Sequence, residues 1–316
     1  MKQGGPNTSH RRSFLDYLVL AAKGFCMGAS DVVPGVSGGT MAFILGIYEE
    51  LINAIRSFDL KGIRLLVTLK ITEFLDRTAW SFLLALGIGI LTAIFTLSRG
   101  LGWLLQNRPV LIWSFFLGLI LASVLSVSRR IGRWYLFTWI SLLAAIVGAY
   151  LLVGIVPVST PNAPWFLFLS GALAICAMIL PGISGSFILV LLGKYQFVLE
   201  AVNTRDFFVL SLVAGGAVVG IVAFSRLLGW LLERHHDLMV AVLTGLMLGS
   251  LRKVWPWKVT QESMMGPHGK LIPLVQSNVL PSEWSTEVII ALCLMGLGLL
   301  VVLILDRLGS RGSQSG

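Results

Sequence analysis

The sequence predicts an all-α integral membrane protein made of two inverted-topology repeats, each with five apolar segments. Composition is the first reason: of 316 residues only 12% are charged and 56% are hydrophobic, whereas a soluble domain carries about twice that charge. Ten long apolar stretches are the second reason. The third is a short motif of proline, glycine and serine that occurs once in each half of the chain.

The apolar stretches have the length of membrane helices, since a spanning helix needs about 20 residues. Five of them lie on each side of the uncharged loop 157–164, which is the division that two repeats require. The ten predicted segments are 14–33, 36–56, 79–98, 109–128, 134–156, 164–180, 182–200, 207–228, 237–251 and 286–305.

The two halves also align residue by residue. With an offset of 147, Pro34–Tyr48 matches Pro181–Tyr195 at seven of 15 positions. With an offset of 127, Ser98–Ser123 matches Ser225–Ser250 at 12 of 26 positions, including an arginine and a tryptophan. The difference of 20 residues (147 − 127) locates an insertion in the first half, at about 58–78, which we expect to form an amphipathic helix on the membrane surface.

The number of segments sets the relative direction of the halves. Five is an odd number, so the second half enters the membrane from the opposite side, and the same holds if the first two segments form a re-entrant hairpin. With the N-terminus inside, 14 of the 24 Lys and Arg residues are cytoplasmic, seven are outside and three fall within or at the ends of apolar runs. Because positive charge favours the cytoplasmic side, we expect both termini in the cytoplasm.

These boundaries divide the chain into four parts. Repeat 1 covers 13–156, with its insertion at about 58–78, and repeat 2 covers 164–307. Short polar ends at 1–12 and 308–316 are expected to be flexible. The N-terminal end lacks a small-residue cleavage site after a short apolar core, so no removable signal peptide is predicted.

Proline interrupts the apolar segments at Pro34 and Pro181. It lacks the backbone N–H and restricts the residue before it, and the glycine that follows permits a tight return. Open backbone at membrane depth is tolerated only where protein or a wet cavity satisfies it. We therefore predict a re-entrant or broken-helix hairpin at each proline, with the two hairpins meeting near the midplane.

The residues after each proline predict an anion site. Each motif places hydroxyls and free backbone N–H groups at the start of a helix, the end that carries partial positive charge and favours phosphate or carboxylate. The alternative is that these small residues only let helices pack closely. We favour binding because the motif is duplicated beside proline. The candidate substrate-binding residues of the motifs are Ser37, Gly38, Gly39, Thr40, Ser184, Gly185 and Ser186.

Two acidic residues near the first motif are candidates for coupling to H+ or Na+. Asp31 precedes Pro34 by three residues in an apolar environment, where a carboxylate is costly and is therefore a functional candidate. It could carry a proton, or it could cap the helix that begins after the proline, and both roles stay open. Glu49, on the returning segment, could pair with Lys23 or lie in cytoplasmic water.

Basic residues complete the candidate substrate-binding set. Lys23 could attract an anion or snorkel to the interface, and for Lys194, beside the second motif, we favour snorkelling. Arg99 and Arg226 occupy equivalent positions, so inverted halves place them on opposite faces. Arginine can hold phosphate through two parallel hydrogen bonds, although an ordinary interfacial anchor beside tryptophan fits the pattern equally well.

The sequence lacks the signatures of other classes of protein function. Cys26, Cys176 and Cys293 have no paired spacing, and His235-His236 has no further ligands for zinc, so we predict neither disulfides nor a metal site. No nucleophile elbow, zinc-protease motif or P-loop is found. We expect no enzyme activity and no cofactor. The basic residues are scattered between apolar runs, so no nucleic-acid partner is expected either.

The motif residues resemble a known family. The run Gly28–Thr40 followed by Gly46–Tyr48 closely resembles the first signature of a bacterial membrane family now described as PopT-type polyprenyl-phosphate translocases. Leu180–Ser186 with Gly193–Tyr195 resembles the second signature, and the resemblance covers about 12–307. It implies a transporter of the bacterial cytoplasmic membrane that returns undecaprenyl phosphate, the carrier of cell-wall and surface-glycan synthesis, from the outer to the cytoplasmic leaflet.

We accordingly predict a translocase that works by alternating access. The phosphate head would cross between the hairpins while the tail stays in lipid, so the expected partners are the polyprenyl-phosphate lipid and the membrane lipids. The oligomeric state stays open. One alternative is an ion-coupled transporter of a small soluble anion, which would use the same site. Another is a membrane enzyme acting on lipid pyrophosphate, which would need an acid/base and nucleophile set that the sequence does not show.

Overall fold

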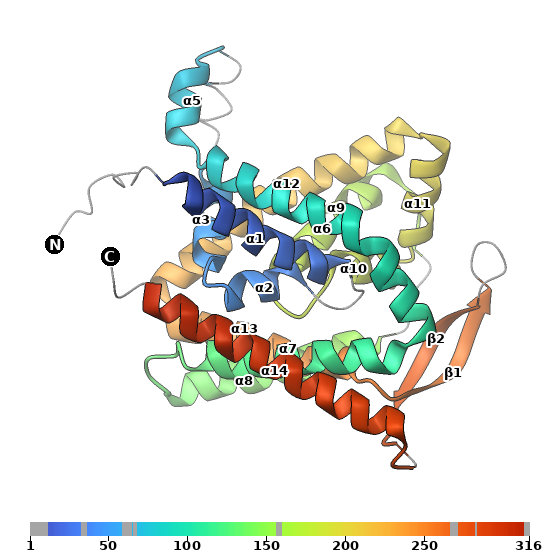
Figure 1. Cartoon of the computed structure of the whole chain (residues 1–316). Coiled ribbons are helices and arrows are strands. Elements are labelled where there is room, and N and C mark those ends of the chain that lie inside the picture. The colour runs from blue at the N-terminus through green and yellow to red at the C-terminus, as the bar shows by residue number, and fades with distance from the viewer. Residues whose placement is uncertain are drawn as a thin grey trace.

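The computed structural model describes residues 12–32, 37–58, 65, 68–155, 160–265, 271–281 and 283–312, and this part of the chain is largely helical (Figure 1). The first half contains α1 (Phe14–Asp31), α2 (Gly38–Ile44), α3 (Tyr48–Arg56), α5 (Ile71–Arg77), α6 (Trp80–Asn107), α7 (Pro109–Ser128) and α8 (Leu136–Gly154). The second half contains α9 (Pro164–Ile179), α10 (Gly185–Leu191), α11 (Tyr195–Thr204), α12 (Phe207–Arg234), α13 (His236–Val254), strands β1 (Lys258–Met265) and β2 (Leu271–Asn278), and α14 (Thr286–Gly312).

Five of the described helices are long and apolar enough to cross a membrane, namely α6, α7, α8, α12 and α14. The pair α10 and α11 passes the same test together but is bent by 106° at its break, as a broken span or a re-entrant loop would be. Each of the ten predicted apolar segments contains a described helix or a broken pair of helices. The structure therefore confirms a helical, multi-pass membrane protein.

One segment departs from the predicted all-α class. β1 and β2 form an antiparallel pair after α13, with Lys258 opposite Asn278. Both strands mix polar residues with Val, Ile and Thr, which suit a half-exposed strand better than a membrane helix. The hairpin is fastened to the end of α13, because Asn278 Nδ2 donates to Arg252 O (2.9 Å) and Trp255 Nε1 donates to Val279 O (2.8 Å).

The two halves contain the same succession of elements. In each half a helix of 18 or 16 residues (α1, α9) is followed by a seven-residue helix (α2, α10), a short returning helix (α3, α11) and a 28-residue helix (α6, α12). The turn after each seven-residue helix contains a glycine with positive φ, Gly46 at 69° and Gly193 at 63°. Such a φ favours glycine, so the sequence repeat has a counterpart in the local structure.

The last helix of each half packs against the opposite half. α8 lies along α13 and α14 lies along α7, whereas α1 packs on α6 and α9 on α12 within their own halves (Figure 1). The shared core includes Ile120 of α7 and Leu243 and Met247 of α13, each at most 1% exposed. Neither half therefore encloses a complete core of its own.

Gly298 allows α14 to approach α7 closely, because a Cβ atom at this position would lie 2.3 Å from Phe115 O. Gly298→Ala should push the helices apart and lower the free energy of unfolding by about 1–3 kcal/mol. Gly296→Ala is the matched control on the same helix, since a Cβ there meets nothing within 4 Å. Thermal unfolding in detergent checks the prediction, and equal melting temperatures for the two variants would contradict it.

The predicted insertion is described only in part. Residues 59–64, 66 and 67 lie outside the described residues, and the helix seen is α5, which extends away from the bundle in Figure 1. The segment that follows α5 is tied back to α3, because Ala79 N donates to Ser57 Oγ at 3.1 Å. Placement of this insertion on the membrane surface stays a prediction, as does flexibility of the ends at 1–11 and 313–316, which also lie outside the described residues.

Candidate functional site

The two proline motifs meet inside the bundle. Ser37 Oγ donates to the backbone oxygens of Met178 (3.0 Å) and Leu180 (3.3 Å). Gly182 N donates in the other direction, to Thr40 Oγ1, at 3.0 Å. Residues 141 to 143 positions apart in the chain are thus in direct contact. The structure places the two predicted halves of the site together.

The break at the second motif follows from its local chemistry. α9 ends at Ile179, and Leu180 takes extended backbone (φ −71°, ψ 131°), the conformation that a following proline favours. Gly182 then reverses the chain with φ 88°, which side-chain-bearing residues rarely adopt. In the first motif Pro34 belongs to the segment 33–36, outside the described residues, so the break is seen directly only in the second half.

Each motif serine caps the seven-residue helix that follows it. Ser37 Oγ accepts a hydrogen bond from Gly39 N (3.1 Å), and Ser184 Oγ accepts one from Phe187 N (3.2 Å). A capping serine satisfies an N–H group that has no partner within the helix. Both hydroxyls therefore stabilise the hairpins in this conformation, in addition to any role toward a ligand.

The two motifs differ in how deeply they are buried. Ser37 and Thr40 are 0% and 1% exposed, and their hydroxyls are engaged with the second half. Ser184 is half-buried and Ser186 is exposed, with their Oγ atoms 3.2 Å apart. The predicted site is closed at the first motif and reaches the surface at the second. The three candidate glycines Gly38, Gly39 and Gly185 are buried.

A carboxylate of the chain itself occupies the first motif. Asp31 Oδ1 accepts a hydrogen bond from Gly38 N at 2.7 Å, and a Cβ on Gly38 would lie 2.5 Å from Asp31 Oδ2. Of the two roles predicted for Asp31, capping is present in this structure. The residue equivalent to Asp31 in the second half is Met178, so the second motif has no acidic counterpart at this position.

The other predicted charged residues are not joined to the motifs. Lys23 is half-buried on α1, while Arg99 on α6 and Arg226 on α12 are exposed. Among the residues that the structure describes, neither arginine has a hydrogen-bond or ion-pair partner. Glu49 pairs with His236 rather than with Lys23, its Oε1 lying 3.5 Å from Nε2.

The expected snorkelling of Lys194 is wrong. Its side chain is only 1% exposed, and Nζ donates to Thr160 O (2.7 Å) and Asn162 Oδ1 (2.5 Å). These oxygens of the connecting loop take the place of water around the amine. The lysine therefore joins the second hairpin to the loop between the halves instead of reaching the membrane interface.

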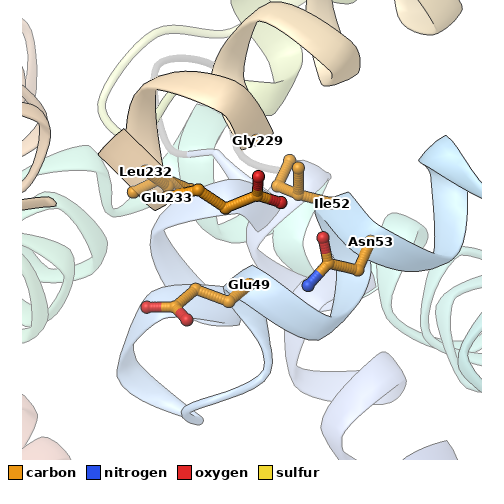
Figure 2. A pocket seen from close by; sticks show the side chains of 6 residues that line it. All are labelled: Glu49, Ile52, Asn53, Gly229, Leu232 and Glu233. Atoms are coloured by element: carbon orange, nitrogen blue, oxygen red, sulfur yellow. The ribbon is translucent and has the colours of Figure 1, made fainter. Parts of the chain in front are cut away.

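Contact between the halves is asymmetric at the returning helices. α3 packs against α12 of the other half, and Arg56 of α3 forms an ion pair with Glu233 of α12. A cavity of about 70 Å³ lies between them, and Figure 2 shows Glu233 reaching from α12 toward Ile52 and Asn53 on α3. In the described structure α11, the counterpart of α3, makes its main contacts with α10 and α12 of its own half.

A sequence profile of the undecaprenyl phosphate translocase-like family matches residues 27–272, a span that includes both motifs. The chain belongs to this family. A protein of Vibrio cholerae serotype O1 named polyprenyl-phosphate transporter is 42% identical over 299 residues, 93% of this chain and 97% of its own length. A Staphylococcus aureus protein of the same name is 32% identical over 255 residues, 74% of this chain and 84% of its own length. No solved structure gives a significant match.

Membership in the undecaprenyl phosphate translocase-like family confirms the resemblance drawn from the motif residues. The family and both relatives are named for transport rather than for a chemical reaction. This translocase-like chain is therefore a membrane transporter and not an enzyme.

Sequence reasoning missed a larger cavity in this translocase-like protein. It has a volume of about 690 Å³ and lies between the start of α7, the end of α13 and the β1–β2 hairpin. Lys253 and Lys258 line it, yet in the sequence they counted only among the positive charges outside. One signal could have identified them: the two lysines flank Trp255 and Trp257 directly after an apolar helix.

Proposed function

We propose that this protein moves undecaprenyl phosphate from the outer to the cytoplasmic leaflet of the bacterial inner membrane, for reuse of the lipid carrier. Membership in the family, and two relatives named polyprenyl-phosphate transporters, support the substrate. The observation that carries the mechanism is the direct contact between the motifs, from Ser37 to the 178–180 backbone and from Gly182 to Thr40. A headgroup bound there would be held by both halves at once.

Alternating access would follow from inversion of the halves. Their equal succession of elements and odd number of segments support opposite orientations, which would direct the two motifs to opposite faces of the membrane. All of α2 is buried, whereas in α10 the buried residue is Gly185. We assign this conformation as closed toward the cytoplasm, where α3 is tied to α12, and open outside at the second motif. In the opposite state, which is open toward the cytoplasm, the contact between α3 and α12 would be replaced by one between α11 and α6.

The headgroup would pass between the motifs in two steps. Its phosphate oxygens would first accept hydrogen bonds from Ser184 and Ser186, at the motif that reaches the surface. It would then replace the Asp31 carboxylate at Gly38 N, after Asp31 takes up H+ or Na+. Glu49 is the second candidate for coupling. Of the basic residues, Arg99 and Arg226 would meet the headgroup on opposite faces, and Lys23 would attract it at the first motif.

Ser184→Ala/Ser186→Ala should slow flipping of undecaprenyl phosphate about tenfold, because the open motif would lose both hydroxyls that receive the phosphate. The lost cap should cost only about 1 kcal/mol of stability. The rate is measured in reconstituted vesicles from the accessibility of the headgroup to a membrane-impermeant phosphatase. Ser211→Ala, an exposed serine of α12 bonded to its own helix at Phe208 O, is the control.

Unaltered flipping in this double variant, and in Arg99→Ala/Arg226→Ala, would reject the proposed headgroup site. Competition experiments address the substrate separately. If soluble phosphate competes for transport while lipid phosphates do not, the protein carries a small anion and the lipid assignment fails.

A further inference from the structure

The 690 Å³ cavity combines positive charge with apolar walls. Its volume is in the range of ligand sites, about 300–1,000 Å³. Lys253 comes from α13 and Lys258 from β1, and the described residues that line the cavity include no carboxylate. Trp113 of α7 and Trp257 contribute aromatic surface. A ligand complementary to this lining has an anionic group attached to an apolar chain.

The two lysines are held close together and partly out of water. Lys258 Nζ donates to the backbone oxygen of Lys253 and lies 4.9 Å from the centroid of the Trp113 ring. Burial, and secondarily the charge of Lys253, lowers the pKa of Lys258 to about 8. Neither lysine has a carboxylate partner among the described residues. Two like charges in such surroundings are stabilised when an anion binds between them.

Lys253 also connects the cavity to the second motif. Its Nζ lies 5.3 Å from the centroid of the Phe187 ring, and Phe187 N is the donor that Ser184 caps. The β1–β2 hairpin beside the cavity is at the end of the bundle away from α3 and α5 (Figure 1). The cavity therefore lies next to the motif that is open, on the side opposite the contact between α3 and α12.

We propose that this cavity is a receiving site for a phosphate monoester headgroup on the outer side of the membrane. Lys253 and Lys258 bind the phosphate, and the wall formed by Trp113 contacts the first isoprene units of the chain. The headgroup then moves past Lys253 to Ser184 and Ser186. Assignment of the ligand to a lipid rests on the proposed function, whereas the anion chemistry rests on the cavity alone.

Direct binding tests the site, with farnesyl phosphate and inorganic phosphate as probes of the full-length protein in nanodiscs. Lys253→Gln/Lys258→Gln should weaken farnesyl phosphate binding at least about tenfold, the equivalent of one lost charge-assisted hydrogen bond. Lys70→Gln, which removes an exposed lysine paired with Glu73 far from the cavity, should bind like wild type. Lys258→Arg keeps the charge and should retain most of the affinity.

The pH dependence separates a charge effect from a structural one. A phosphate monoester is largely dianionic above pH about 6, so the ligand does not gain charge as the pH rises further. Lys258 loses its proton as the pH rises through about 8, and wild-type binding should weaken over that interval. Among the described lining residues, Lys253 is the other titratable group. Lys258→Arg should bind with a flatter pH profile because arginine stays protonated.

The outcomes distinguish this site from the proposed function. Unchanged farnesyl phosphate binding in the double lysine variant overturns the site, while normal flipping by the same wild-type preparation leaves the proposed function standing. Wild-type protein that binds the probe but flips no undecaprenyl phosphate rejects the proposed function and keeps the site. Equal affinity for inorganic and farnesyl phosphate overturns the assignment to a lipid headgroup.

Discussion

Gly182→Ala should slow flipping of undecaprenyl phosphate about 100-fold, the loss that a displacement of about 1 Å in a binding geometry can cause. The glycine has φ 88°, and an added Cβ would lie 2.7 Å from Ser250 Oγ and 3.0 Å from Leu246 O. The second motif would have to move away from α13. That movement would break the hydrogen bond from Gly182 N to Thr40 Oγ1, through which the two motifs touch.

Two further variants make this result interpretable. Gly148→Ala adds the same methyl group on α8 with nothing within 4 Å, and should leave both flipping and the melting temperature in detergent unchanged. Gly182→Ala/Ser250→Ala removes the nearest obstructing atom and should restore part of the lost rate and stability. Wild-type flipping by Gly182→Ala would show that transport does not depend on the contact between the motifs.

Asp31→Asn should abolish the response of flipping to an imposed H+ or Na+ gradient, lowering gradient-driven transport about tenfold. The asparagine oxygen can still accept from Gly38 N, as Asp31 Oδ1 does at 2.7 Å, so the first hairpin should keep its shape. The variant lacks the negative charge that, in our proposal, must be neutralised before phosphate enters. Rates in vesicles with and without the gradient measure the effect.

Glu49→Gln provides the comparison for Asp31→Asn. Glu49 is on the surface of α3 and pairs with His236, so its loss should loosen the contact between the halves without removing the response to the gradient. A full gradient response in Asp31→Asn combined with its loss in Glu49→Gln would move the coupling role to Glu49. A full response in both variants would remove both residues from the coupling mechanism.

Much of the fold could be predicted because its determinants are local. Hydrophobic length placed a helix or a pair of helices in each of the ten predicted segments, of which five, or six with the bent pair α10 and α11, can cross a membrane. The proline at 181 marked the end of α9 to within two residues. The matching turns at Gly46 and Gly193 were visible as the same residue types at one offset. The β1–β2 hairpin was missed because a loop between apolar segments carries no hydrophobic period that separates a strand from an irregular chain.

The candidate site was predicted in part for the same reason. Duplicated serines and glycines identified the two motifs, and the structure brings Ser37 and Thr40 against the second one. For Asp31 the sequence left two roles open, capping of α2 and coupling to an ion. Nothing in the sequence indicated that Lys194 would be enclosed by the loop at Thr160, since that contact depends on how the two halves are joined.

The sequence by itself determined where the apolar helical segments lie and which local elements of the two halves correspond, because hydrophobicity and proline act on neighbouring residues. Only the tertiary structure decided that α8 and α14 pack on the opposite halves, that the first motif is closed while the second is open, and that Lys258 faces Trp113 in one cavity. These features arise from contacts between residues far apart in the chain. Their free energy depends on the packing of whole helices, which no local pattern of residues specifies.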